Sequence, residues 1–174
     1  TANGEQVEIR PVSEDFGNLL LTGPHARHVL SRVTGVPLDN ENFPWLTAQD
    51  IDVAGAPLTA MRLSYPGELG WELHAPINQL PELHDALREA GEARGIDDFG
   101  SYALNAMRME KRYPGAHELT NEVTLQEAGL GFFFKEGKGD FVGRDAAIKR
   151  NENGGEWRLL YLAVDTEDAD CLGG

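Results

Sequence analysis

Residues 58–75 read LTAMRLSYPGELGWELHA. Within this stretch, Leu58–Tyr65 and Trp71–Ala75 are apolar runs of strand length, and a turn with two glycines separates them. Side chains of the second run alternate between two faces, so its large apolar residues share one face. The other face carries Glu72 and His74. The stretch therefore predicts an antiparallel pair of strands with one apolar and one polar face.

Upstream segments extend this pair into a sheet. Gln49–Val53 is a third predicted strand, and residues 54–57, AGAP, form its hairpin connection to the pair. Further upstream, Val7–Ile9 and Phe16–Leu21 are predicted strands. A helix is predicted between Pro24, which suits a first helical turn, and Gly35, which ends it.

Downstream segments supply helices that cover the sheet. Apolar spacing predicts a helix over residues 80–93, with Asn78 as its cap and Gly95 at its end. A second helix is predicted from Ser101 to Lys111, because Pro114 cannot continue it.

The last third of the chain is predicted to be less regular. Residues 131–143, GFFFKEGKGDFVG, indicate an apolar strand and a glycine-rich loop. Asp145–Arg150 is predicted to be a short helix, and Arg158–Val164 a last strand. Strands joined by hairpins and single helices favour an α+β fold, with antiparallel sheets flanked by helices.

Composition excludes several classes of function. The 174 residues include 29 acidic and 15 basic residues, for a formal net charge of -14. This charge repels a phosphate backbone, so we expect no nucleic-acid partner. No apolar run approaches the roughly 20 residues of a bilayer span, so we expect no membrane insertion. We expect a soluble, cytoplasmic protein, and both ends of the chain indicate a piece of something longer.

No metal site is predicted. Cys171 is the only cysteine, so the sequence offers neither a disulfide nor a cysteine cluster for zinc. His25 and His28 are three positions apart on a predicted helix, but no second pair of ligands accompanies them. His117-Glu118 lacks the second histidine of the H-E-x-x-H motif.

Glu72 has two interpretations. On the polar face of its strand, it either points to solvent or faces a ligand pocket. A buried carboxylate needs partners, and a ligand edge with two parallel N–H donors provides a bidentate match. The pyrimidine edge of a pterin is such a ligand. Tyr65 is either a core aromatic residue or a neighbour that stacks on a flat ring, and Glu68 in the turn is expected in solvent.

A family resemblance extends this interpretation. SYPGELGWELHAP resembles the motif of the glycine-cleavage aminomethyltransferase (T-protein) family, in the variant at the carboxyl-terminal region of dimethylglycine and sarcosine dehydrogenases and oxidases. Three further stretches are similar to that variant in the same order, namely DDFGSYALNAMRMEK, LQEAGLGFFFK and DFVGRDAAIK. With EIRPVSEDFGNLLLTGPHARHVLSRVTG, the likeness spans nearly the whole chain.

The resemblance implies a three-lobed α+β fold that holds tetrahydrofolate at its centre. By motif matching, Glu72 is the carboxylate that recognises the pterin, and Tyr65 lies beside the folate. The catalytic aspartate of the family belongs to a segment upstream of this chain, so the catalytic residue is unassigned. A folate-binding arginine of the family matches Leu104 here, which makes Arg108 a structural or secondary candidate.

The resemblance also implies a role in one-carbon transfer. A flavin domain or subunit outside this chain would use FAD to oxidise an N-methyl amine such as dimethylglycine or sarcosine, and this module would capture the carbon as methylene-tetrahydrofolate. Residues 1–155 would form the folate-binding module, and residues 156–174 the start of a truncated C-terminal barrel lobe. Two alternatives stay open, a non-catalytic folate-binding or scaffold module and a flavin-independent folate-dependent demethylase.

A local basic patch is expected, because folate carries an acidic glutamate tail and the chain is acidic overall. The candidates by sign of charge are Lys111, Arg112, Lys135, Lys138 and Arg144.

Overall fold

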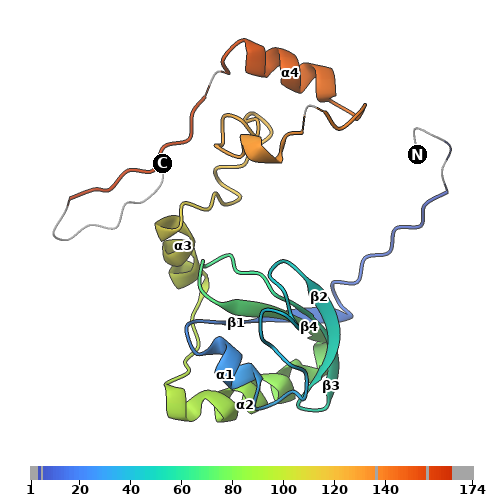
Figure 1. Cartoon of the computed structure of the whole chain (residues 1–174), viewed down its shortest axis with the longest axis vertical. Helices are drawn as coiled ribbons and strands as arrows, with labels where there is room; N and C mark the ends of the chain where they lie inside the picture. Colours follow the sequence, from blue (N-terminus) through green and yellow to red (C-terminus); the bar gives the residue numbers. More distant parts are fainter. Residues whose placement is uncertain (1–3, 5, 136, 156, 166–174) are drawn as a thin grey trace. The chain divides into compact units, whose positions relative to one another are not determined.

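The chain folds into two compact units, residues 1–111 and residues 112–174 (Figure 1). The computed structural model describes the following residues: 4, 6–135, 137–155 and 157–165. The division into a folate-binding module and a barrel lobe after residue 155 stays a prediction. Cys171 lies outside the described residues.

The first unit contains a four-stranded antiparallel sheet with the strand order β1-β4-β3-β2. The strands are β1 (Phe16–Thr22), β2 (Ala48–Val53), β3 (Ala56–Met61) and β4 (Gly70–Pro76). The predicted meander of β2, β3 and β4 is confirmed, and β1 pairs along the free side of β4. The predicted α+β class is confirmed as well.

The hairpin between β2 and β3 is tighter than the predicted connection over residues 54–57. Ala54 and Gly55 form the turn alone, with φ angles of 53° and 85°. Positive φ at both positions is typical of a two-residue type I′ turn, whose twist matches that of the strands it joins. The Gly55 N–H also donates a hydrogen bond of 2.8 Å to the Asp52 side chain. Pro57 therefore belongs to β3 rather than to the turn.

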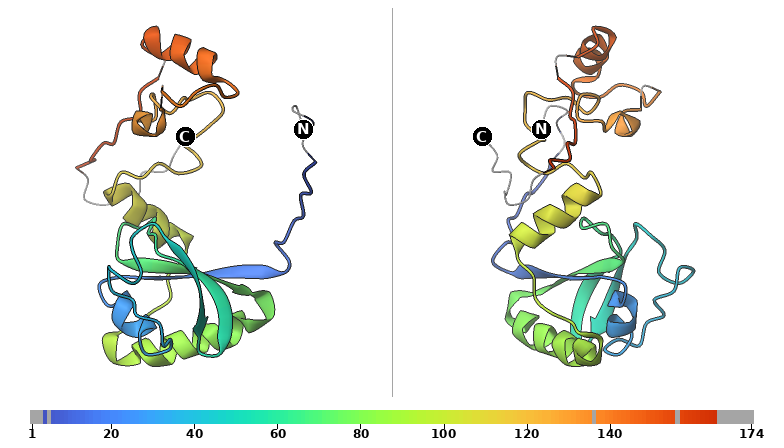
Figure 2. Two further views of the ribbon diagram at one scale, coloured as in Figure 1. Left: turned by 45° about the vertical axis from the view of Figure 1, so that its right-hand side comes forward. Right: turned by 90° about the vertical axis from the view of Figure 1, so that its left-hand side faces the viewer.

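Two helices cover one face of the sheet (Figure 2). These are α1 (Ala26–Leu30), shorter than predicted, and α2 (Leu80–Gly91), which carries the predicted apolar stripe. A 3₁₀ turn, η1 (Ile77–Gln79), precedes α2. The prediction of Asn78 as a cap was wrong, because Asn78 lies within this turn and Gln79 occupies the capping position.

The prediction that Gly95 stops this helical segment is confirmed. The helix passes into a second 3₁₀ turn, η2 (Glu92–Arg94), and Gly95 follows with a φ of 69°. Glycine adopts this left-handed conformation without the Cβ clash that other residues incur. The next helix is α3 (Ser101–Glu110), as predicted.

The core of the first unit lies between the sheet and the pair α1 and α2. Trp71, Leu73 and Ala75 of β4 have no exposed surface, as the alternation of β4 predicted. The Trp71 ring meets Phe43 edge to face, with ring centroids 6.1 Å apart. Such contacts add to the free energy gained by burying the two rings.

Arg62 is a buried charged residue that contacts the core. Only 7% of this residue is exposed, and its guanidinium lies 5.7 Å from the centre of the Trp71 ring. It donates hydrogen bonds to the Phe43 carbonyl and to Asn40 Oδ1, which fixes the loop before β2. Burial, and then the nearby Arg27, lower the pKa of Arg62 from its usual value. The sequence pattern did not predict this buried charge.

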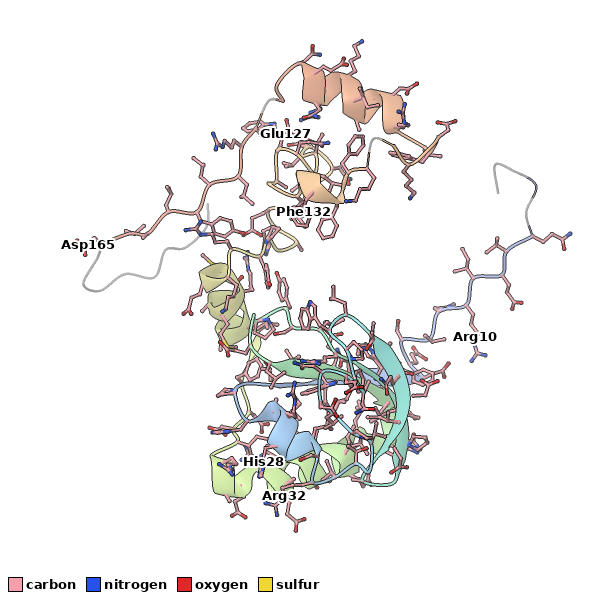
Figure 3. The ribbon with its side chains drawn as sticks, in the orientation of Figure 1. Arg10, His28, Arg32, Glu127, Phe132 and Asp165 are labelled. Carbon is pink, nitrogen blue, oxygen red and sulfur yellow. The ribbon has the colours of Figure 1, made fainter. Side chains whose placement is uncertain are left out.

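The second unit is organised by a buried carboxylate. Glu127 is 6% exposed, and Figure 3 labels it among the turns that precede η3 (Gly131–Phe133). It accepts hydrogen bonds from Thr124, Arg150 and the Trp157 backbone, over distances of 2.7 to 3.3 Å. Arg150 belongs to α4 (Arg144–Glu152), the predicted short helix.

Three predicted strands are absent from the described residues. Val7–Ile9 and Arg158–Val164 have extended or irregular backbone without a ladder, and the apolar part of residues 131–143 forms η3 instead. A strand requires a neighbouring strand for its hydrogen bonds. In the described residues these segments form no ladder, although the Leu159 N–H donates one hydrogen bond of 2.9 Å to the Glu127 carbonyl, so their apolar side chains stay largely exposed.

No helix in the described part of the chain has the length and apolar character that a bilayer span requires.

Candidate functional site

Glu72 lies in the middle of β4 and alternates with the buried Trp71 and Leu73, so it is on the sheet face opposite the core. In the antiparallel register it pairs with Leu20 of β1 and with Met61 of β3. Residues that pair in this way project from the same face. The carboxylate therefore has an apolar neighbour on each flanking strand. Its side chain is 24% exposed, so it is neither buried in the core nor fully in solvent.

His74 follows Glu72 on the same face of β4. Its Nε2 atom lies 3.2 Å from Oε2 of Glu72, within hydrogen-bonding distance. Across the sheet, His74 pairs with Thr59, whose hydroxyl donates a hydrogen bond of 2.6 Å to Asp50. The open face thus carries two carboxylates, an imidazole and a hydroxyl in adjacent rows.

Tyr65 lies in the connection between β3 and β4 and is half-buried. The connection is well defined locally, since the Gly67 N–H donates to the Ser64 hydroxyl at 3.1 Å and Pro66 is fully buried. Gly67 has a φ of 84°, and a Cβ at this position would overlap the Lys111 side chain. Lys111 therefore packs against this connection from the end of α3, and it places one of the predicted basic candidates beside the motif.

A pocket of about 580 Å³ follows the β1 edge of the sheet. This volume is within the range of small-molecule sites. Residues of β1, α1, α2 and the segment that leads into α3 line it, and Leu20 and Leu104 are among them. Leu20 pairs with Glu72 in the sheet, but Glu72 itself does not line this pocket.

Two ion pairs connect residues that line this pocket. Arg88 of α2 lies 3.0 Å from Asp97, and His84 lies 3.0 Å from Asp98. The hydrogen bond from Arg88 lowers the pKa of Asp97, and the hydrogen bond to Asp98 raises the pKa of His84. These ion pairs therefore tie Asp97 and Asp98, which follow α2 in the chain, back to that helix.

The His84 pair predicts a pH-dependent term in stability. Because its folded-state pKa is raised, the stabilisation is present below the unfolded value of about 6.5 and is lost as pH rises through the raised value. We expect His84→Ala to cost about 0.5 kcal/mol at pH 5.5, as for other exposed pairs, and less at pH 9. Urea unfolding at both pH values measures this. His28→Ala, at an exposed position of α1, is the control, and an equal loss at both pH values would contradict the prediction.

The remaining candidate residues are Arg108, His25 and His28. Arg108 is 4% exposed, and its guanidinium donates to Asn105 of the same helix at 2.6 and 2.9 Å. His25 and His28 are both exposed, and no three potential metal-ligating side chains come together among the described residues.

Residues 1–138 match the family described as the GCVT N-terminal domain. The chain belongs to this family. The motif at residues 64–76, with Tyr65 and Glu72, lies inside the matched range.

The chain covers only part of the length of its individual relatives. Mitochondrial dimethylglycine dehydrogenase of Mus musculus is 39% identical over 98% of this chain, which spans 20% of that protein. Mitochondrial sarcosine dehydrogenase of Mus musculus is 38% identical over 89% of the chain and 17% of that protein. An aminomethyltransferase of Desulfitobacterium hafniense is 33% identical over 94% of the chain and 44% of that protein. These relatives are enzymes, and the chain spans less than half of each. The cytoplasmic location stays a prediction.

Sequence reasoning missed two features of the site. Alternation placed Glu72 and His74 on one face, but it carried no sign of their hydrogen bond. The two ion pairs of the pocket wall were missed as well, although the adjacent acids Asp97 and Asp98 shortly after Arg88 were a signal that could have indicated them.

Proposed function

We propose that this chain is a tetrahydrofolate-binding part of an aminomethyltransferase-type enzyme, and that Glu72 binds the pterin. Membership of the GCVT family supports this proposal. The observation that carries it is the placement of Glu72 on an open sheet face, partly shielded and flanked by Leu20 and Met61.

The residues present fit such a ligand. A carboxylate accepts two parallel N–H bonds, which is what the pyrimidine edge of a pterin offers. Leu20 and Met61 can contact the faces or edges of a flat ring, and Tyr65 in the adjoining connection can stack or hydrogen-bond. Lys111, packed on Gly67, supplies a positive charge near the motif that partly offsets the acidity of the chain.

In this proposal the chain acts mainly by positioning. Bound tetrahydrofolate supplies the amine nitrogens that accept a one-carbon unit. Glu72 fixes the orientation of the pterin, and the protein surface around it excludes part of the solvent. Holding two reacting groups in one site replaces a bimolecular encounter by a bound geometry.

The finer part of the proposal concerns the substrate. The names of two relatives, dimethylglycine dehydrogenase and sarcosine dehydrogenase, support an N-methyl amine as the source of the carbon. The proposed product is methylene-tetrahydrofolate. A flavin domain or subunit outside this chain is the proposed partner that oxidises the amine.

The proposal is tested by titrating the 174-residue chain with tetrahydrofolate in a calorimeter under anaerobic conditions. We expect saturable binding, weakened about tenfold or more in Glu72→Gln, because a hydrogen bond to a charged group contributes about 1.5–3 kcal/mol. Glu68→Gln is the matched control, since Glu68 lies in the same motif but is exposed.

Each result bears on a defined part of the proposal. Equal affinity for the wild-type chain and Glu72→Gln would place the pterin elsewhere. A folded wild-type chain that binds no tetrahydrofolate at high ligand concentration contradicts the proposal for this chain. Tryptophan fluorescence, to which the fully buried Trp71 beside Glu72 contributes, reports whether each variant is folded.

A further inference from the structure

The Glu72–His74 pair has a defined polarity. An ionised carboxylate has no proton to donate, so the His74 Nε2 that faces it at 3.2 Å must carry the hydrogen. In the neutral imidazole this assigns the lone pair to Nδ1. The hydrogen bond therefore runs from His74 to Oε2 of Glu72.

This bond occupies only part of the acceptor capacity of Glu72. Each carboxylate oxygen accepts two hydrogen bonds, so Oε1 and one further site on Oε2 stay available. A ligand edge with two N–H donors can still bind both oxygens. His74 thus restrains rotation of the carboxyl group without filling the positions that a ligand needs.

The surroundings restrict His74 itself. It pairs with Asn18 of β1 and with Thr59 of β3, so side chains of both neighbouring strands flank the ring. Together with Asp50 it lines a shallow hollow of about 400 Å³ on the open face. The titratable groups on this face near the ring are Asp50 and Glu72, and the Asp50 carboxylate is engaged by the Thr59 hydroxyl.

We infer that His74 is a positioning residue, which orients the Glu72 carboxylate for a bidentate contact with the pterin. This inference rests on the proposed function. Pre-orientation matters because a free carboxyl group rotates about a broad torsion and loses that freedom on binding. A donor already bonded to one oxygen lowers this entropic cost.

A matched pair of variants tests the inference. His74→Gln keeps an N–H donor at a similar reach, whereas His74→Met keeps the length of the side chain and removes the donor. We expect His74→Met to weaken tetrahydrofolate binding about fivefold and His74→Gln to stay within about twofold of the wild-type chain, as for loss of one hydrogen bond. In the Glu72→Gln background, His74→Met should weaken binding no further, because the group that it orients is gone.

The outcomes separate this inference from the proposed function. If Glu72→Gln weakens binding but His74→Met does not, the role of His74 is wrong and the folate site stands. If His74→Met is equally harmful with and without Glu72→Gln, or if His74→Gln is as weak as His74→Met, the histidine acts independently of the carboxylate and the inference fails. If the folded wild-type chain binds no tetrahydrofolate, both fail. Circular dichroism of each variant shows that the fold is retained.

Discussion

Replacing Trp71 by Ala should destabilise the first unit by about 3–5 kcal/mol, the usual cost of removing a large buried aromatic side chain. Trp71 has no exposed surface, contacts Phe43 edge to face and lies beneath the Arg62 guanidinium. Ala would leave a cavity between the sheet and its helices, and it would also leave Arg62 without the ring over which it lies. Urea unfolding followed by far-ultraviolet circular dichroism measures the loss.

Two variants serve as controls for this result. Trp45→Ala removes the same side chain from a position that is 51% exposed, and it should change stability by about 0.5 kcal/mol or less. Trp71→Phe retains an aromatic ring and should fall between Trp71→Ala and the wild-type chain. If Trp71→Ala unfolded at the same urea concentration as Trp45→Ala, the placement of Trp71 at the centre of the core would be wrong.

One strand, β4, contributes residues both to the core and to the candidate site. Successive side chains of β4 point to opposite faces, so Trp71 and Leu73 build the core while Glu72 and His74 remain on the open face. Trp71→Ala should therefore reduce stability, whereas Glu72→Gln should reduce ligand affinity in a folded chain. Because the two residues are adjacent, displacement of β4 by a core mutation would affect both properties.

The elements predicted correctly are those whose sequence signal is local. Alternation over β4, the glycine turn before it and the apolar stripe of α2 each involve residues close together in the chain, and each has its predicted form. The stop at Gly95, which follows α2 and η2, was also predictable, because few residues adopt a φ of 69° without strain.

The strands predicted wrongly depend on a partner that local sequence cannot supply. Val7–Ile9 and Arg158–Val164 have apolar, β-favouring composition, but a ladder forms only where a second segment offers its hydrogen-bonding groups. In the described residues the Leu159 N–H donates one bond to the Glu127 carbonyl, but neither segment forms a ladder. Ile9 and Leu162 remain 88% and 82% exposed as a result.

The candidate site was predictable in position but not in its contacts. Alternation placed Glu72 away from the core, and family resemblance singled it out together with Tyr65. The approach of His74 to Glu72, the packing of Lys111 on Gly67 and the buried state of Arg108 depend on side-chain rotamers and on contacts between distant segments. Neither periodicity nor composition contains that information.

Replacing Glu127 by Leu should unfold the second unit. Glu127 accepts bonds from the Thr124 N–H and hydroxyl, from the Trp157 N–H and from Arg150, and its side chain is 3% exposed. Leu fills similar space but leaves these donors and the Arg150 charge without their acceptor. Leaving a buried donor without its acceptor costs about 1–3 kcal/mol, and Glu127 serves several donors, so the summed loss is comparable to the whole stability of a small unit.

Hydrogen exchange read by mass spectrometry separates the two units in one experiment. In Glu127→Leu, peptides from residues 120–160 should lose protection, while peptides that contain β4 and α2 should exchange as in the wild-type chain. Glu122→Leu is the matched control, because its side chain is exposed and only its backbone carbonyl accepts a bond from Arg150. Unchanged protection of residues 120–160 in Glu127→Leu would show that the carboxylate does not hold this unit together. Loss of protection in β4 as well would show that the first unit depends on the second for its stability.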